Sequence, residues 1–170
     1  GSLIAGSGQA IFGNGPQSFT GLYITNNWII NNTGRYGFFV DGNHNVGESG
    51  TRAPSISGNL FDKNLQGLNL GYQSFGVFGA PVLGTYGGYI NNNTFSNHAA
   101  NGIQAGCQHV QLTGNTFSSN TLSGLVFTSF GSAVATRGAQ NCSITNNQFL
   151  NNGTSGADAG VVCSSTQAAG

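Results

Sequence analysis

The chain has 170 residues, of which only 5% are charged, and four basic and four acidic side chains give a formal net charge of zero. This composition excludes the clustered basic surface that binds nucleic acid or an anionic membrane. No apolar run approaches the length of a bilayer span, so we expect no membrane span. Hydrophobic residues make up 38% of the chain, enough to bury a core, and we expect one folded domain over residues 1–170.

A short phrase recurs five times along the chain, an aliphatic residue followed three positions later by asparagine. The aliphatic anchors are Ile24, Ile56, Ile90, Leu112 and Ile144. The asparagines are Asn27, Asn59, Asn93, Asn115 and Asn147. Two positions after each asparagine come Ile29, Phe61, Phe95, Phe117 and Phe149. Each phrase then continues through Asn32, Asn64, His98, Asn120 and Asn152 to a Gly–apolar pair that begins at Gly37, Gly67, Gly102, Gly124 and Gly160.

Apolar residues within each repeat alternate, as in Phe38 and Val40, which is the period of a strand with one buried face. Short strands separated by Asn/Gly turns at a fixed period predict an all-β solenoid, a parallel β-helix of about five to six coils. Identical side chains would then stack as ladders of asparagine amides and phenylalanine rings. We expect His98 to replace asparagine in its ladder as a hydrogen-bonding residue, and Trp28 to face outward.

The aliphatic–x–x–Asn–x–Phe–x–x–Asn phrase with its Gly–apolar ending resembles the right-handed parallel β-helix repeat of the pectate-lyase-like superfamily, which includes phage tailspikes. The resemblance covers residues 22–163 and implies a right-handed solenoid. That superfamily contains lyases, hydrolases, epimerases and phage tailspikes, so the resemblance implies a fold more directly than an activity.

Insertions of roughly ten residues lengthen the coils at about 41–54, 71–88 and 128–141, whereas the third coil is short. Because these insertions follow the same strand of each coil, we expect them at one corner, where they form either a binding face or a subunit interface. The predicted carbohydrate-binding residues around the short coil are Tyr72, Tyr86, Gln108, His109 and Arg137.

Catalytic residues are sparse, because the chain has four carboxylates and polysaccharide cleavage needs a paired acid and base. Asp41, His44 and Glu48 share the first insertion with Arg52, and these three are the candidate catalytic residues. Their alternative role is that of a solvated polar loop. Asp62 and Lys63 fit a solvated turn. The sequence predicts no metal site and no cofactor.

These observations favour polysaccharide or cell-surface glycan recognition outside the cell or on a virion, with or without depolymerising activity. A polysaccharide lyase, glycoside hydrolase or epimerase is one alternative, and a non-catalytic structural or adhesive solenoid is another. A β-helix exposes strand edges at its ends, and no cap is evident here. We therefore expect a homotrimer or a larger assembly, and a chain that is one domain of a larger protein.

Overall fold

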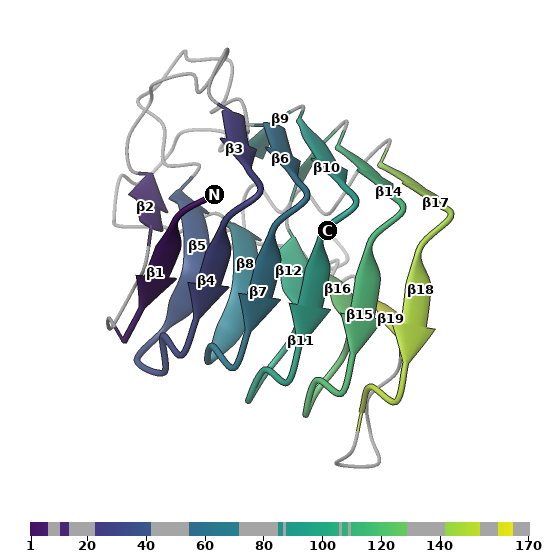
Figure 1. The fold of residues 1–170 in the computed structure, drawn as a ribbon. Helices are drawn as coiled ribbons and strands as arrows, with labels where there is room; N and C mark the ends of the chain where they lie inside the picture. Colours follow the sequence, from purple (N-terminus) through teal and green to yellow (C-terminus); the bar gives the residue numbers. More distant parts are fainter. Residues whose placement is uncertain are drawn as a thin grey trace, which may run out of the picture.

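The computed structural model describes residues 1–6, 11–13, 23–41, 55–71, 85–86, 88–105, 107–108, 110–128, 142–153 and 160–164. These residues form stacked parallel strands in three main sheets, so the predicted all-β parallel β-helix is confirmed. Figure 1 shows successive coils lying side by side along one axis. Within the described ranges, no helix is long and apolar enough to cross a membrane.

Each coil passes through the three sheets in the same order, which we name sheets C, A and B. Sheet C contains β3 (Tyr23–Thr25), β6 (Ser55–Ser57), β10 (Tyr89–Asn91), β14 (Gln111–Thr113) and β17 (Ser143–Thr145). Sheet A contains β1 (Leu3–Ala5), β4 (Trp28–Ile30), β7 (Leu60–Asp62), β11 (Thr94–Ser96), β15 (Thr116–Ser118) and β18 (Gln148–Leu150). Sheet B contains β2 (Ile11–Gly13), β5 (Tyr36–Asp41), β8 (Gln66–Gly71), β12 (Ile103–Ala105), β16 (Leu125–Thr128) and β19 (Val161–Ser164). A two-stranded sheet pairs β9 (Thr85–Tyr86) with β13 (Cys107–Gln108).

The register of the sheets follows the repeat. In sheet C, Ile90 pairs with Ile56 and Leu112, so the aliphatic anchors stack. In sheet A, Phe95 pairs with Phe61 and Phe117, and in sheet B the apolar residues after the glycines pair from coil to coil. Because side chains alternate between the two faces of a strand, this register buries the anchors Ile24, Ile56, Ile90 and Leu112 inside the solenoid. Ile144, in the outermost strand β17 of sheet C, is 38% exposed.

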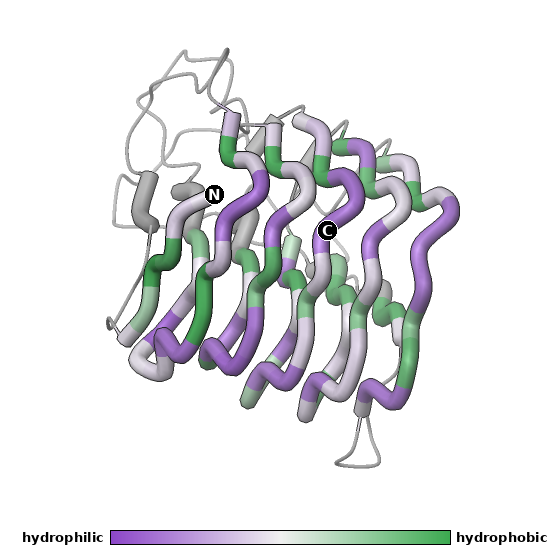
Figure 2. Tube along the Cα trace, viewed as in Figure 1, coloured by the Kyte–Doolittle hydropathy of each residue, from purple (hydrophilic) through white to green (hydrophobic). Residues whose placement is uncertain are grey.

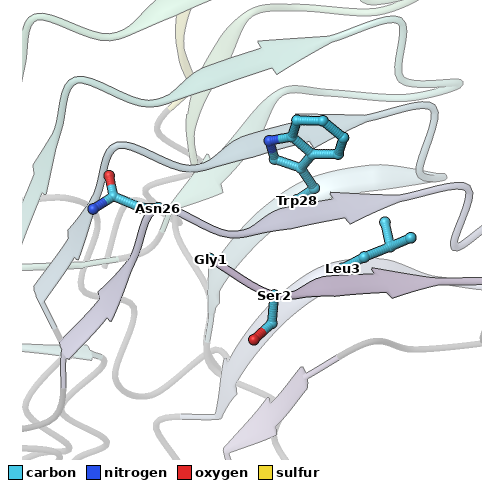
Figure 3. A pocket seen from close by; sticks show the side chains of 5 residues that line it. All are labelled: Gly1, Ser2, Leu3, Asn26 and Trp28. Atoms are coloured by element: carbon cyan, nitrogen blue, oxygen red, sulfur yellow. The ribbon is translucent and has the colours of Figure 1, made fainter.

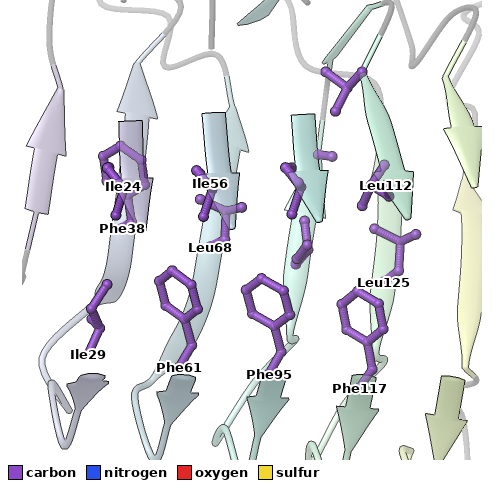
Figure 4. Close-up of a cluster of buried hydrophobic side chains, with 14 of the residues drawn as sticks. Ile24, Ile29, Phe38, Ile56, Phe61, Leu68, Phe95, Leu112, Phe117 and Leu125 are labelled. Atoms are coloured by element: carbon purple, nitrogen blue, oxygen red, sulfur yellow. The ribbon is translucent and has the colours of Figure 1, made fainter. Parts of the chain in front are cut away.

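The core is a set of stacked apolar columns (Figure 4). Phe61, Phe95 and Phe117 are fully buried, and Phe149 packs against them at the end of the column. Neighbouring rings lie 4.8–5.1 Å apart between centroids, with interplanar angles of 4–11°. The predicted phenylalanine stack is therefore confirmed.

Asparagine ladders hold the two turns that flank sheet A. In the first ladder the Asn115 amide donates to the Asn147 side chain at 2.9 Å and to the Ile90 carbonyl at 2.7 Å. Its oxygen accepts hydrogen bonds from the Asn93 backbone and side chain, both at 3.0 Å. Each amide thus satisfies polar groups of two neighbouring coils, and Figure 2 shows these hydrophilic corners beside the apolar strands.

The turns explain the choice of asparagine and glycine. The residue before the first ladder has a left-handed backbone in Asn26, Gly58, Asn92, Gly114 and Asn146, a conformation that these two residue types adopt most readily. A different constraint acts at Gly67, where a Cβ atom would lie 2.5 Å from the Gly102 carbonyl and 2.8 Å from the Phe95 ring. The glycine of each Gly–apolar pair therefore permits close stacking of coils.

Substituting Asn115 with alanine tests the first ladder. The change leaves the buried Ile90 carbonyl and Asn93 amides without this partner, so we expect the free energy of unfolding to fall by about 2 kcal/mol. Urea denaturation monitored by circular dichroism measures the loss. Asn91→Ala, on the outward side of β10, is the matched control and should cost less than about 0.5 kcal/mol. Equal losses in the two variants would contradict the stabilising role of the ladder.

Candidate functional site

Of the predicted catalytic residues, the structure describes only Asp41. Asp41 ends β5 and pairs with Gly71 at the end of β8. His44, Glu48 and Arg52 lie outside the described residues. The arrangement of Asp41, His44 and Glu48 as an acid–base group therefore stays a prediction.

Asp62 is bound into the fold more firmly than a solvated turn requires. Its carboxylate accepts hydrogen bonds from the Ser96 hydroxyl and the Asn97 amide, each at 2.7 Å. Both donors belong to the next coil, so Asp62 connects two turns at the edge of sheet A. The interpretation of Asp62 as a simply solvated residue was wrong, whereas Lys63 is exposed as expected.

The predicted carbohydrate-binding residues Tyr86 and Gln108 come together in the structure. They are direct register partners in the parallel pair β9–β13, although they are separated by 22 positions in the sequence. Tyr72, His109 and Arg137 lie outside the described residues. The structure thus brings two of the five residues into adjacent coils, and their role in binding stays a prediction.

A second, larger group of outward side chains lies on sheet C, whose strands β10 and β14 follow β9 and β13 in the chain. The outward positions of sheet C form one row across the coils, which we call the tyrosine face: Tyr23, Ser55, Tyr89, Gln111 and Ser143. Tyr23 is 70% exposed and Tyr89 is 51% exposed. The neighbouring outward row carries hydroxyl and amide groups from Thr25, Ser57, Asn91, Thr113 and Thr145.

The register fixes the geometry of this face. Tyr23 pairs with Ser55, and the pairing of Ile90 with Ile56 aligns Tyr89 with the same position, so the two tyrosines stand two coils apart with a serine between them. Coils of parallel strands are spaced by about 4.8 Å, which separates the two tyrosine Cα atoms by about 10 Å. Both tyrosines are exposed, and the residue between them, Ser55, has a small side chain.

Backbone continuity joins the tyrosine face to the β9–β13 pair. Tyr86 precedes Tyr89 by three residues, and Gln108 precedes Gln111 by three. A hydrogen bond of 3.1 Å from the Gln111 amide to the Gly88 carbonyl connects the two segments across the coils. The predicted residues and the tyrosine face therefore border each other along the third and fourth coils.

The tyrosine face is electrically neutral. The charged residues of the described ranges are Arg35, Asp41, Asp62 and Lys63, and they belong to sheets A and B or to the turns between them. The two outward rows of sheet C contain hydroxyl, amide and phenol groups instead. Such groups bind polar, uncharged ligands by hydrogen bonding, and the phenol rings add an apolar surface.

A separate apolar area lies on sheet A (Figure 3). Trp28 is 60% exposed, as expected for an outward residue, and Leu3 beside it in β1 is 62% exposed. With Gly1, Ser2 and Asn26 these side chains line a hollow of about 390 Å³. It offers an indole ring and an amide but no ionisable side chain.

In the ranges that the structure describes, no three His, Cys, Asp or Glu side chains lie close enough together to hold a metal ion. The half-buried Cys142 packs against the apolar core.

Sequence reasoning missed the exposed position of Tyr23 because it followed the insertions. The signal was present, since Tyr23 and Tyr89 each stand directly before an aliphatic anchor. Alternation along a strand places the residue before an inward anchor on the outside. Comparing the residue before the anchor in all five repeats would have identified the outward row of the tyrosine face.

Comparison with known proteins agrees with this architecture. Residues 49–168 match the model of a family described as a right handed beta helix region. This match spans more than half of the chain, and the protein belongs to that family. No curated protein and no solved structure shows significant similarity to the chain.

Proposed function

We propose that the protein recognises a polysaccharide or cell-surface glycan through the tyrosine face. The observation that carries the proposal is the pair of exposed rings, Tyr23 and Tyr89, in one neutral row of hydroxyl and amide groups. Pyranose sugars have apolar C–H faces and hydroxyl edges, so a flat surface with aromatic rings and neutral hydrogen-bonding groups is complementary to them.

The β-helix suits this role because it holds the ligand-binding side chains on rigid strands. Each tyrosine is the first residue of a strand whose central residue is buried, Ile24 in β3 and Ile90 in β10. A preorganised surface loses little conformational entropy on binding. In this proposal the domain works outside the cell or on a virion, like the receptor-binding part of a phage tailspike, and as part of a trimer or larger assembly.

The proposal does not depend on catalysis. Among the carboxylates, Asp62 is engaged with Ser96 and Asn97 on another sheet. A lyase, hydrolase or epimerase activity would instead use the predicted residues Asp41, His44 and Glu48, of which Asp41 ends β5 in sheet B. Mass spectrometry of a bound glycan after incubation separates binding from depolymerisation.

Removing both rings tests the binding site. We expect the double variant Tyr23→Ala/Tyr89→Ala to lose at least about tenfold in glycan affinity, because each ring contributes on the order of 1 kcal/mol of stacking. A glycan array identifies the ligand, and isothermal titration calorimetry measures the loss. The melting temperature should change little, since both side chains are exposed.

Trp28→Ala is the matched control, because Trp28 is an exposed aromatic residue on sheet A and not on sheet C. It should retain wild-type affinity. A loss on Trp28→Ala with none on the double tyrosine variant would place the glycan on sheet A. Failure of the wild-type protein to bind any glycan would overturn the proposed function.

A further inference from the structure

Resting on the proposed function, we infer that the ligand of the tyrosine face is a neutral, extended polysaccharide that runs along the solenoid axis, with Tyr23 and Tyr89 stacking on sugars two units apart. The inference concerns the class of glycan and its direction on the protein.

The direction follows from the placement of the rings. Each strand of sheet C is three residues long, and Tyr23 and Tyr89 lie in different strands, β3 and β10. A linear ligand that contacts both rings must therefore cross β6 between them. Strands of a β-helix run around the axis, so a chain that crosses them follows the axis.

The spacing favours an extended glycan. Two coils span about 10 Å, which is close to the length of a disaccharide in a ribbon-like, β-1,4-linked chain of pyranoses. Sugars one coil apart would then sit over Tyr23, Ser55 and Tyr89 in turn. Because Ser55 carries a short side chain, its sugar meets a hydroxyl group and no bulky obstacle. A coiled glycan would leave this straight row after one contact.

Neutrality follows from the side chains around the row. The described part of sheet C has no lysine or arginine on its outward face to pair with a sugar carboxylate. The hydroxyl groups of Thr113 and Thr145, 3.0 Å apart, and the amide of Asn91 continue the neutral surface beside it. An acidic polymer would lose part of its hydration on this face without gaining an ion pair.

A length series of soluble oligosaccharides tests both parts of the inference. The probes are β-1,4-linked gluco-, manno- and xylo-oligosaccharides, from disaccharide to hexasaccharide. For at least one series we expect affinity to rise on the order of tenfold from the disaccharide to the trisaccharide, since the trisaccharide is the shortest probe that reaches both rings. Binding should change little between low and high salt, because no charge pair contributes.

A shifted variant provides the matched control. In Tyr89→Gln/Gln111→Tyr the second ring moves one coil further along the row, from β10 to β14, with the composition unchanged. The step in affinity should then move to the tetrasaccharide. A step that stays at the trisaccharide in this variant would overturn the axial direction.

Acidic and coiled probes separate this inference from the proposed function. Oligogalacturonates and malto-oligosaccharides should bind at least about tenfold more weakly than the best neutral extended probe. If one of these binds best and loses affinity in Tyr23→Ala/Tyr89→Ala, the tyrosine face still binds glycan and the inferred class is wrong. If no saccharide binds at all, the proposed function itself fails.

Discussion

Replacing Phe95 with alanine is expected to lower the free energy of unfolding by about 4 kcal/mol. Phe95 is fully buried in the middle of the ring column, stacked 4.8 Å from Phe61 and 5.1 Å from Phe117. The substitution removes a large apolar side chain and both stacking contacts. The solenoid constrains the neighbouring coils by backbone hydrogen bonds on all three sheets, so the cavity cannot close by simple collapse.

Phe149→Ala is the matched control, because Phe149 stands at the end of the same column and is only partly buried. It loses one ring contact, 4.8 Å from Phe117, and should cost no more than about half as much. Urea denaturation followed by circular dichroism compares the midpoints. Equal shifts for the two variants would show that the column does not act as a continuous stabilising unit.

Most of the fold could be predicted from the sequence, because every coil of a solenoid has the same strands and turns and therefore needs the same residue types at the same spacing. Each coil needs an inward aliphatic residue, an asparagine at the turn and a large apolar residue after it, which is isoleucine at Ile29 and phenylalanine in the later coils. The spacing of Ile90, Asn93 and Phe95 therefore repeats the spacing of Ile56, Asn59 and Phe61, and the structure pairs them position by position. A slip of one residue would have turned the core side chains outward.

The candidate site was harder to predict than the core. Outward residues have no common stacking requirement, so Tyr23, Ser55, Tyr89, Gln111 and Ser143 differ from coil to coil and show no motif. The pairing of Tyr86 with Gln108 depends on strands of only two residues, too short to show a period. The hydrogen bonds of Asp62 likewise depend on which residues the next coil places beside it.

The tyrosine face is a better candidate for ligand binding than for catalysis. Stacking and hydrogen bonding need only side chains placed in register, which the repeat supplies. Catalysis needs an acid and a base at a defined separation, and in the described structure the outward rows of sheet C carry no carboxylate. For hydrolytic or lyase chemistry, Asp41, His44 and Glu48 stay the predicted residues.

One ladder position departs from asparagine, and the departure makes stability depend on pH. His98 is fully buried, and its Nδ1 atom accepts a hydrogen bond of 3.1 Å from the Asn64 backbone amide. This bond requires an unprotonated Nδ1, so the neutral ring carries its proton on Nε2. Among the described residues, Nε2 has no hydrogen-bond partner. Burial lowers the pKa of His98 from 6.5 to about 4, although the negative charge of Asp62 acts in the opposite direction.

We expect acid to destabilise the protein through His98. Because its pKa is lower in the folded chain, the unfolded chain binds a proton between pH 6.5 and about 4 that the folded chain does not. The free energy of unfolding therefore decreases as the pH falls through this window and should lose about 3 kcal/mol from this residue, at about 1.4 kcal/mol per pH unit. Below pH 4 the folded chain is protonated as well, and this contribution stops changing. Urea denaturation at a series of pH values measures the slope.

His98→Asn separates this effect from other titrating groups. Asparagine occupies the corresponding ladder positions at Asn64 and Asn120, where its side-chain oxygen accepts the backbone amide of the preceding coil. The variant keeps that acceptor and has no group that titrates in the window, so its stability should depend less on pH between 6.5 and 4. If His98→Asn and wild type lose stability in parallel over this range, the acid sensitivity arises from groups other than the buried imidazole.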